Sequence, residues 1–185
     1  MGDSPLHRFR RGRTARVTLA DMLDRIIEAE GGYVDDPSDA GGATNFGVTQ
    51  ATLGAWRGHD VTKDDVKALT QNEARSIYTS EYLTKPGYDA IANEDLRAVL
   101  LDCAVQFGPA RATEWLQNAI GVPPDGKVGP QTILAMTHAD HRSVIIKIMA
   151  QRIRRRGRRI TDQPSQAKFA AGWASRDAAL IEGAA

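Results

Sequence analysis

The stretch that most constrains the fold is residues 30–47, EGGYVDDPSDAGGATNFG, in which five glycines and a proline interrupt any regular helix. Proline and glycine end or bend helices, and closely spaced Gly, Asn and Asp residues favour turns. The only large apolar residues of 33–49 are Tyr33, Val34, Phe46 and Val48, which suits a short irregular hairpin better than a helix. The chain is therefore predicted to change here from a preceding element into a small β-structured turn.

An amphipathic helix precedes this stretch. Thr18 followed by Asp21 resembles a capping box, and Gly31 supplies a C-terminal stop. Between these signals the apolar residues fall on one helical stripe: Leu19, Met22, Leu23, Ile26 and Ile27. Glu30 is therefore predicted to lie on the last turn of this helix.

Similar signals predict helices along most of the remaining chain. Two helix starts lie at Thr62 with Asp65 and at Thr70 with Glu73. Further helices are predicted over about 94–107, from Pro109 to Gly121, over about 130–137, over about 141–156 and from 166 to 181. Residues 160–166 are predicted to form a short loop. The expected fold class is mainly α, formally α+β: a helical bundle with one small β-hairpin next to the first helix.

Length and composition narrow the class of protein. A chain of 185 residues that is 42% apolar can bury one core, or one domain with a small appendage. No stretch approaches the roughly 18 apolar residues of a membrane span, and no signal peptide is recognisable, so synthesis in the cytoplasm is expected. The single Cys103 lies among apolar residues and is predicted to be a buried, inert thiol. The four histidines show no metal-ligand grouping, so neither a metal nor a cofactor is expected.

The basic residues are concentrated in two segments although the net charge is only +1. Residues 1–16 carry five arginines against Asp3, and residues 142–159 carry eight Lys or Arg and no acid. The run RIRRRGRR at 152–159 is suited to an anionic envelope polymer, and a solvated helix face is the equally plain alternative. No aromatic residue is interleaved with these arginines, so specific nucleic-acid binding is not expected.

Glu30 has the environment expected of a proton donor. The negative end of a helix macrodipole disfavours an ionised carboxyl, by up to about 1 kcal/mol, so burial in a cleft must supply the rest of the effect. A protonated glutamic acid is what glycosidic-bond cleavage needs, beside a second carboxylate that positions water or stabilises the transition state. The alternative is that Glu-Gly ends this helix for capping reasons alone.

Motif spacing supports the catalytic interpretation. Glu30, eight residues, Asp39, four residues and Thr44 resemble the signature of phage-type lysozymes, with one residue fewer before the threonine. The chain resembles glycoside hydrolase family 108, the N-acetylmuramidases, more closely over roughly 19–178. The similar segments are EGGY (30–33), DAGGAT (39–44), GVT (47–49), IYTSEYL (77–83), the block 101–122, PDGKVGPQTILAM (124–136) and FAAGWASR (169–176).

This resemblance implies that Glu30 is the essential acid. Asp39 is the best second carboxylate by spacing, Asp35 and Asp36 are alternatives, and Asp39 also suits a turn residue. Thr44 is expected to hold the catalytic water or the sugar, or to be an ordinary hairpin residue. Residues expected to bind substrate are Tyr33, Asn45, Tyr78, Gln106 and Asp125.

Two positions depart from the family pattern, since Gln106 stands where asparagine is expected and Leu83 where an aromatic residue is usual; both are expected near the cleft. Trp56 is a candidate for stacking on sugars, whereas Trp115 and Trp173 fall on apolar stripes and are predicted to be core. The block from Leu116 to Met136 resembles a peptidoglycan-binding module, with a purely structural connector as the alternative.

The expected organisation is a flexible basic arm at 1–17, a lysozyme-like catalytic region at 18–110, and a peptidoglycan-binding-like helical region at 111–182 packed on it as one unit. The resemblance implies a monomeric endolysin that cleaves the β-1,4 bond between N-acetylmuramic acid and N-acetylglucosamine. It would reach the wall through a holin-type pore or on a secretion or gene-transfer particle. The alternatives are a lytic transglycosylase, a non-catalytic wall-binding protein and, more remotely, a nucleic-acid-binding protein.

Overall fold

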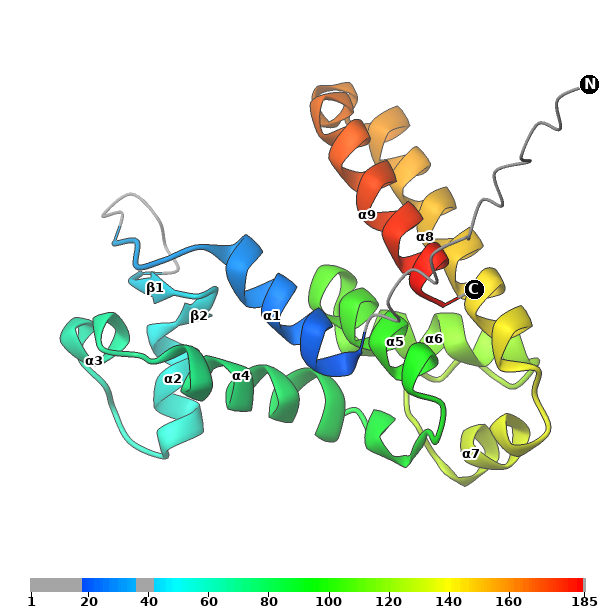
Figure 1. The fold of residues 1–185 in the computed structure, drawn as a ribbon, viewed down its shortest axis with the longest axis horizontal. Coiled ribbons are helices and arrows are strands. Elements are labelled where there is room, and N and C mark those ends of the chain that lie inside the picture. Colours follow the sequence, from blue (N-terminus) through cyan, green and yellow to red (C-terminus); the bar gives the residue numbers. More distant parts are fainter. Residues whose placement is uncertain (1–17, 36–41, 185) are drawn as a thin grey trace, which may run out of the picture.

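The computed structural model describes residues 18–35 and 42–184, so the expected basic arm at 1–17 lies outside the described residues. The described chain is mainly helical with one small hairpin, as predicted (Figure 1). Its elements are α1 (Leu19–Glu30), β1 (Thr44–Asn45), β2 (Val48–Thr49), α2 (Gln50–Arg57), α3 (Lys63–Lys67), α4 (Gln71–Thr79), a π-helical turn (Ser80–Thr84), a 3₁₀ turn (Tyr88–Ala90), α5 (Glu94–Phe107), α6 (Pro109–Ile120), α7 (Pro130–Thr137), α8 (His141–Asp162), a 3₁₀ segment (Pro164–Phe169) and α9 (Ala170–Gly183).

Helix α1 begins and ends where its sequence signals place it. The Thr18 hydroxyl accepts from the Asp21 amide at 3.1 Å, and the Asp21 carboxylate accepts from the Thr18 amide at 2.9 Å, which completes the capping box. Met22, Ile26 and the other predicted apolar residues face the core, with Leu19 packed at its edge. Glu30 is the last residue of the helix, as predicted.

The hairpin predicted within 33–49 is present but short. Thr44 pairs with Thr49 and Asn45 with Val48, so the turn consists of two residues. Val34 forms an antiparallel bridge with Thr44 through two hydrogen bonds of 2.8 Å, which anchors the segment that leaves α1. Helix α2 follows directly and was not predicted. Thr49 is the N-cap of this helix. The same residue ends the second strand of the hairpin, so the sequence was interpreted there as hairpin and not as the start of a helix.

The C-terminal helices differ from the prediction. Helix α8 continues to Asp162 instead of ending near 156, so the loop predicted at 160–166 is wrong. A 3₁₀ segment then leads into α9, which starts at Ala170 instead of 166. Gly157 lowers local helix propensity, but α8 packs against α9 along this stretch, and tertiary packing outweighs propensity.

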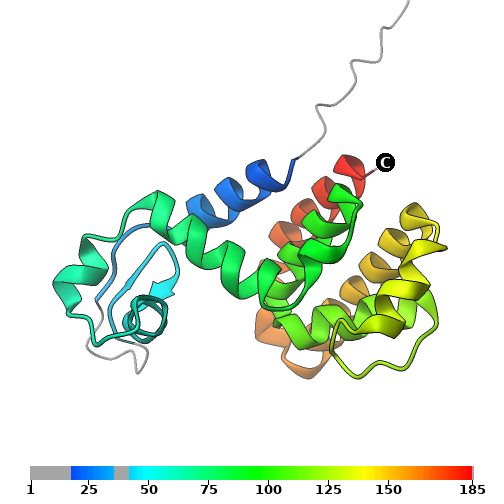
Figure 2. The same cartoon turned by 90° about the horizontal axis from the view of Figure 1, so that it is seen from below.

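Helix α5 is the centre of the fold. It packs against α1, α6 and α8, and Figure 2 shows α1 and α8 on opposite sides of it. The hairpin, α2 and α3 form a small lobe at one end of the molecule, while α8 and α9 run side by side and project from the body (Figure 1). Cys103 is fully buried on α5, as predicted, and burial raises the pKa of its thiol to about 11. No helix of the described ranges is long and apolar enough to cross a membrane.

A buried ionic network fastens the projecting helices to α5. Arg152 on α8 has no exposed surface and pairs with Asp102 of α5 and, at 2.7 Å, with Asp177 of α9. Arg156 pairs with Asp177 at 3.0 Å, and the Arg176 Nε of α9 donates to Asp102 at 2.8 Å. Two arginines of the 152–159 run therefore belong to the interior, so neither the expected polymer site nor the alternative of a solvated helix face describes the whole run.

Replacement of Arg152 by alanine is expected to lower the free energy of unfolding by about 3–5 kcal/mol, because two buried carboxylates lose their shared partner. The matched control is Arg154→Ala on the exposed side of the same helix, with an expected change below about 0.5 kcal/mol. Urea unfolding followed by helicity measures both. Equal effects of the two substitutions would contradict a structural role for the network.

Candidate active site

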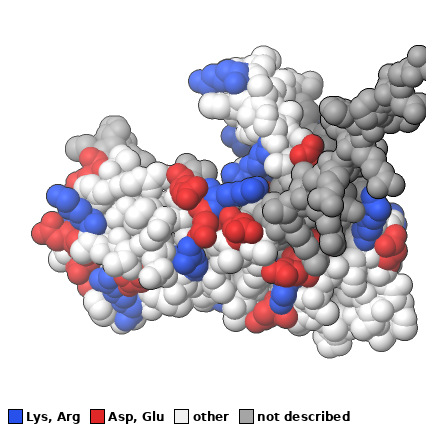
Figure 3. Space-filling view, in the orientation of Figure 1, with Lys and Arg blue, Asp and Glu red and all other residues white. Residues whose placement is uncertain are grey.

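Glu30 lies where α1 gives way to the hairpin lobe. Gly31 follows it with a φ of 80°, a conformation that favours glycine, and turns the chain away from the helix axis. The Glu30 side chain is exposed, so the burial in a cleft that we expected for it is not found in the described structure. Figure 3 shows instead that the surface is hollowed between the hairpin lobe and the projecting α8–α9 pair, with acidic and basic side chains over α1.

The turn of the hairpin meets Glu30 directly. Phe46 and Gly47 both have positive φ, 51° and 71°, as type I′ two-residue hairpins require. A positive φ at Phe46 is a strained conformation for a bulky residue and costs on the order of 1–3 kcal/mol. A Cβ at Gly47 would lie 2.4 Å from Tyr78 Oη and 3.0 Å from Glu30 Cγ. Glycine is therefore the residue that lets the hairpin approach both side chains.

Two tyrosines support this contact from α4 and the π-helical turn. Tyr78 is buried, and its hydroxyl donates to the Phe46 carbonyl at 3.2 Å, which holds the strained turn. Its ring stacks on Tyr82 with 5.5 Å between ring centres. Burial raises the pKa of both tyrosines, and the negative charge of Glu30 adds to the effect, so both hydroxyls stay protonated at neutral pH. Tyr78 thus positions the hairpin, and the substrate-binding role expected for it stays a prediction. Tyr82 was missed, although it lies four residues after Tyr78 in IYTSEYL.

The candidate second carboxylates are only partly described. Asp36 and Asp39 lie outside the described residues. Asp35 is described, and the Lys63 ammonium of α3 donates to it at 2.9 Å, which raises the pKa of the lysine. This pair joins the segment after α1 to α3. Thr44 lies on β1 of the hairpin and is half-buried; its proposed contact with water or sugar stays a prediction.

The other predicted binding residues are divided between surface and interior. Asn45 is buried, and its amide donates to the carbonyls of Val66 at 3.0 Å and Lys67 at 3.2 Å, so it holds α3 to the hairpin; its expected role in substrate binding stays a prediction. Tyr33 is half-buried, with the Lys67 ammonium 5.9 Å from its ring centre. Gln106 is exposed near the end of α5.

Aromatic and apolar positions divide in the same way. Leu83 is buried in the core, so the leucine that stands here in place of the usual aromatic residue does not line the protein surface. Trp56 on α2 is 40% exposed and available for stacking, and Trp115 is core as predicted. Trp173 is half-buried beside Arg156, so its assignment to the core is wrong.

A cavity of about 710 Å³ opens beside α2 and is lined in part by Gly54, Gly58 and His59; Glu30 is not among its lining residues. Within the described residues no group of three or more His, Cys, Asp or Glu side chains is arranged to hold a metal ion.

Comparison with known proteins decides the family. The model for Glycosyl hydrolase 108 matches residues 23–108, and that for a predicted peptidoglycan domain matches residues 111–178. The solved structure of Brucella abortus SagA is 36% identical and superposes with a TM-score of 0.71, covering 90% of this chain and 92% of that one. The chain belongs to glycosyl hydrolase family 108. None of the curated proteins compared with it gives a match.

Membership of family 108, together with the peptidoglycan region, makes the protein a peptidoglycan hydrolase. The two matched regions meet at Gly108–Pro109, between α5 and α6, and these two helices pack against each other. The hydrolase region contains Glu30, the hairpin and both tyrosines. The fold is the mainly α, lysozyme-like arrangement expected from the sequence.

One glutamine holds residues 125–127, in the loop between α6 and α7 of the peptidoglycan region. Gln117 is buried, and its amide nitrogen donates to Asp125 at 2.6 Å and to the Lys127 carbonyl at 2.9 Å, while its oxygen accepts from the Gly126 amide at 2.9 Å. The hydrogen bond from Gln117 lowers the pKa of Asp125. The structure therefore gives Asp125 a structural role, and the substrate-binding role expected for this exposed residue stays a prediction.

The contact between the hairpin and Glu30 can be tested at Gly47. Gly47→Ala is expected to lower turnover of peptidoglycan about ten- to a hundredfold, because the new methyl group displaces Tyr78 and Glu30. Gly58→Ala is the matched control, since Gly58 has a φ of 75° but open space around it, and turnover is expected to change less than about twofold.

Adding Tyr78→Phe to Gly47→Ala removes the hydroxyl that the methyl group meets and is expected to restore part of the lost turnover. Rates of reducing-sugar release from sacculi, with unfolding free energies of the same variants, measure the effect. Equal turnover by Gly47→Ala and Gly58→Ala would show that the hairpin contact does not position Glu30.

Proposed function

We propose that the protein is an N-acetylmuramidase that hydrolyses the β-1,4 bond between N-acetylmuramic acid and N-acetylglucosamine, with Glu30 as the general acid. One observation carries the proposal: in a family 108 chain, the glutamate that ends α1 is held against a strained hairpin turn by Gly47 and Tyr78 and faces solvent. Strained turns that the surrounding structure enforces are characteristic of functional sites.

The proposed reaction begins when a glycan strand lies across the end of α1. The strand excludes water from the carboxyl group, which favours the uncharged form that carries the proton. Glu30 then donates this proton to the departing glycosidic oxygen while the sugar ring develops oxocarbenium character. The hairpin turn lies against the aliphatic part of the Glu30 side chain, which limits the positions that the carboxyl can take when the strand binds.

A second group must stabilise the positive charge or activate water. By spacing we propose Asp39 for this role, with Thr44 of the neighbouring strand as a support for the water. The distance between the two carboxyl groups decides the stereochemistry: about 5–5.5 Å gives retention and about 6.5–9.5 Å gives inversion.

A lytic transglycosylase is the second candidate, because it needs a single glutamic acid. The observation in its favour is that Asp35, the candidate second carboxylate that the structure describes, is engaged by Lys63. A transglycosylase would release the muramyl product as a 1,6-anhydro sugar, whereas a hydrolase adds water across the bond.

We further propose that the protein acts on the wall outside the cytoplasm, as an endolysin delivered through a holin-type pore. Carriage on a secretion or gene-transfer particle is the alternative route. The same wall chemistry would serve either route.

Mass analysis of the products of purified sacculi tests the proposal. Borohydride reduction is expected to convert the new reducing ends to muramitol, as an N-acetylmuramidase requires. Glucosaminitol would indicate cleavage of the other glycosidic bond. Products that borohydride does not reduce, and that are lighter by one water than the unreduced muramidase products, would indicate the transglycosylase. Intact glycan after prolonged digestion would leave only a wall-binding role.

A further inference from the structure

A groove between α6 and α8 gathers arginines that the proposed cleavage does not use. Two adjoining cavities of about 230 and 310 Å³ form it, and both are lined by Arg111 of α6 and Arg155 of α8. Arg154 and Arg158 line the first cavity, and Arg159 lines the second. We call this surface, with its arginines 111, 154, 155, 158 and 159, the arginine groove.

The groove has rigid walls. Residues 151, 154, 155 and 158 recur at helical spacing and therefore share one face of α8. The Gln151 amide donates to the Trp115 carbonyl at 2.9 Å, which fixes this face against α6. Beneath it the Phe107 and Trp115 rings pack 4.9 Å apart. The arginine side chains thus project from α6 and α8, two helices that these contacts hold at a fixed separation.

Positive charge in the groove is poorly compensated. Among the described residues, Arg154, Arg155 and Arg158 have no ion pair or hydrogen bond. Arg111 pairs with Glu114 at 2.6 Å. Arg156, which also lines the groove, is only 6% exposed, and its Nη2 has no hydrogen-bond partner. Burial and the neighbouring Arg152 lower the pKa of Arg156 to about 10, as expected where cations outnumber carboxylates.

This arrangement suits carboxylate ligands. Arginine offers a planar fork of donors that matches the two oxygens of a carboxylate. Helix α6 begins beside the groove at Pro109 without a side-chain cap, so its first backbone amides and its macrodipole also favour an anion. Several carboxylates at short intervals along one flexible chain would meet several of these arginines at once.

We propose that the arginine groove binds the carboxylate groups of the peptide stems of peptidoglycan. The inference rests on the proposed function and names the part of the substrate that lies outside the cleaved glycan. The five arginines all fall within the region that matches the peptidoglycan domain, 111–178. A second contact on the polymer that occupies the active site raises the effective concentration of the substrate.

Other polyanions fit the groove less well. Nucleic-acid bases stack on exposed aromatic faces, but Trp115 is buried and Phe107 is flanked by Arg152 and Arg156, 5.5 and 5.7 Å from its ring centre. A phosphate polymer would also satisfy the arginines, but it is not part of the polymer that occupies the proposed active site. Both become outcomes of the test.

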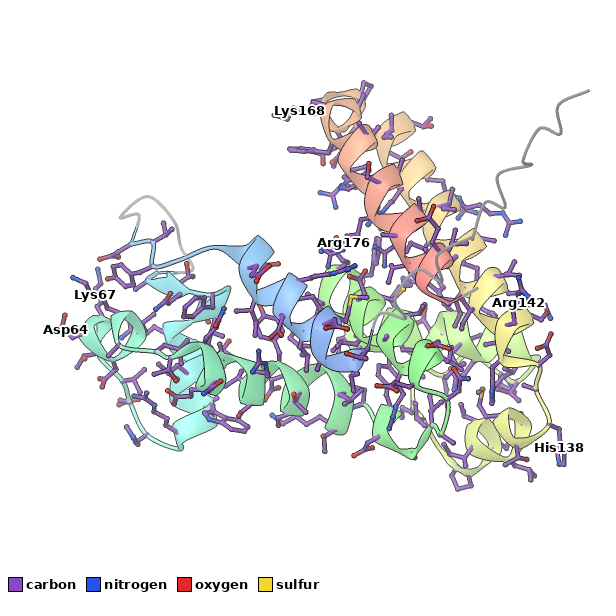
Figure 4. All side chains as sticks on the ribbon, in the orientation of Figure 1. Asp64, Lys67, His138, Arg142, Lys168 and Arg176 are labelled. Carbon is purple, nitrogen blue, oxygen red and sulfur yellow. The ribbon has the colours of Figure 1, made fainter. Side chains whose placement is uncertain are left out.

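The test is binding of the full chain, carrying Glu30→Gln to limit digestion, to native sacculi and to sacculi whose stem carboxylates have been amidated. The groove variant carries Arg154→Gln, Arg155→Gln and Arg158→Gln and keeps Arg152 and Arg156, which the buried network requires. The control carries Lys85→Gln, Arg142→Gln and Lys168→Gln, which remove the same charge from other surfaces; Figure 4 labels Arg142 and Lys168 near the two ends of α8.

On native sacculi the groove variant is expected to bind about tenfold more weakly than the parent, and the control within about twofold. Amidation is expected to weaken the parent to the level of the groove variant and to leave the groove variant unchanged. Equal binding by parent and groove variant on native sacculi would overturn the proposal. The proposal would also be overturned if the groove variant bound amidated sacculi about tenfold more weakly than the parent does. It would be overturned as well if the groove variant lost affinity for added DNA or polyphosphate but not for sacculi.

Turnover of glycan strands stripped of their stems separates this proposal from the proposed function. In the Glu30 background the groove variant is expected to cleave stem-free glycan at the parental rate and sacculi more slowly. Slower cleavage of stem-free glycan by the groove variant would contradict recognition of the stem. If the parent cleaved neither substrate, the muramidase proposal would be rejected. The binding measurements on sacculi would then decide the groove proposal by themselves.

Discussion

The pairing of Arg152 with Asp102 and Asp177 is the interaction on which the arrangement of the whole molecule depends. Asp102 belongs to the hydrolase region, whereas Arg152 and Asp177 belong to the C-terminal helices. The network therefore joins the two parts of the chain at α5, the same helix that supports α1. A charge buried without a partner is far more costly than an imperfect apolar contact, so this pairing fixes how α8 and α9 are seated.

Helix α8 combines two kinds of arginine at a spacing set by the helix itself. Arg152 and Arg156 are four residues apart and point to the interior, whereas Arg154, Arg155 and Arg158 lie on the exposed side. The inner pair stabilises the fold and the outer set forms the proposed site for the stem peptides. One dense basic run thus combines a packing role, which its composition did not reveal, with a proposed role in recognition.

Short sequence signals correctly predicted those helix starts and buried faces that depend on neighbouring residues alone. The Thr18 and Thr62 caps form as their sequences indicated, and the apolar stripe of α1 is buried. Contacts between residues far apart in the sequence could not be predicted in this way. The burial of Arg152 requires Asp102, fifty positions earlier, and Asn45 is held by carbonyls of α3 about twenty residues away. No pattern within a helix or hairpin reports such partners.

The candidate site was predictable to a similar extent. The position of Glu30 at a helix end followed from the Glu-Gly pair, but the contact with Gly47 and Tyr78 depends on how α4 and the hairpin pack. The stacking of Tyr82 on Tyr78 depends on the same packing, so nothing in the sequence distinguished Tyr82 from an ordinary core aromatic residue. Gly47 of the opening stretch lies in a turn, as its composition predicted, and there the turn also lies against the proposed acid.

The central claim is that the carboxyl of Glu30 supplies the proton for cleavage. Its most direct measurement compares Glu30→Gln with Glu28→Gln, an exposed glutamate on the same helix, in the rate of reducing-end release from sacculi. Loss of a general acid predicts a rate about a hundred- to ten-thousandfold below the parent for Glu30→Gln, with Glu28→Gln unchanged. Parental turnover by folded Glu30→Gln would contradict the claim.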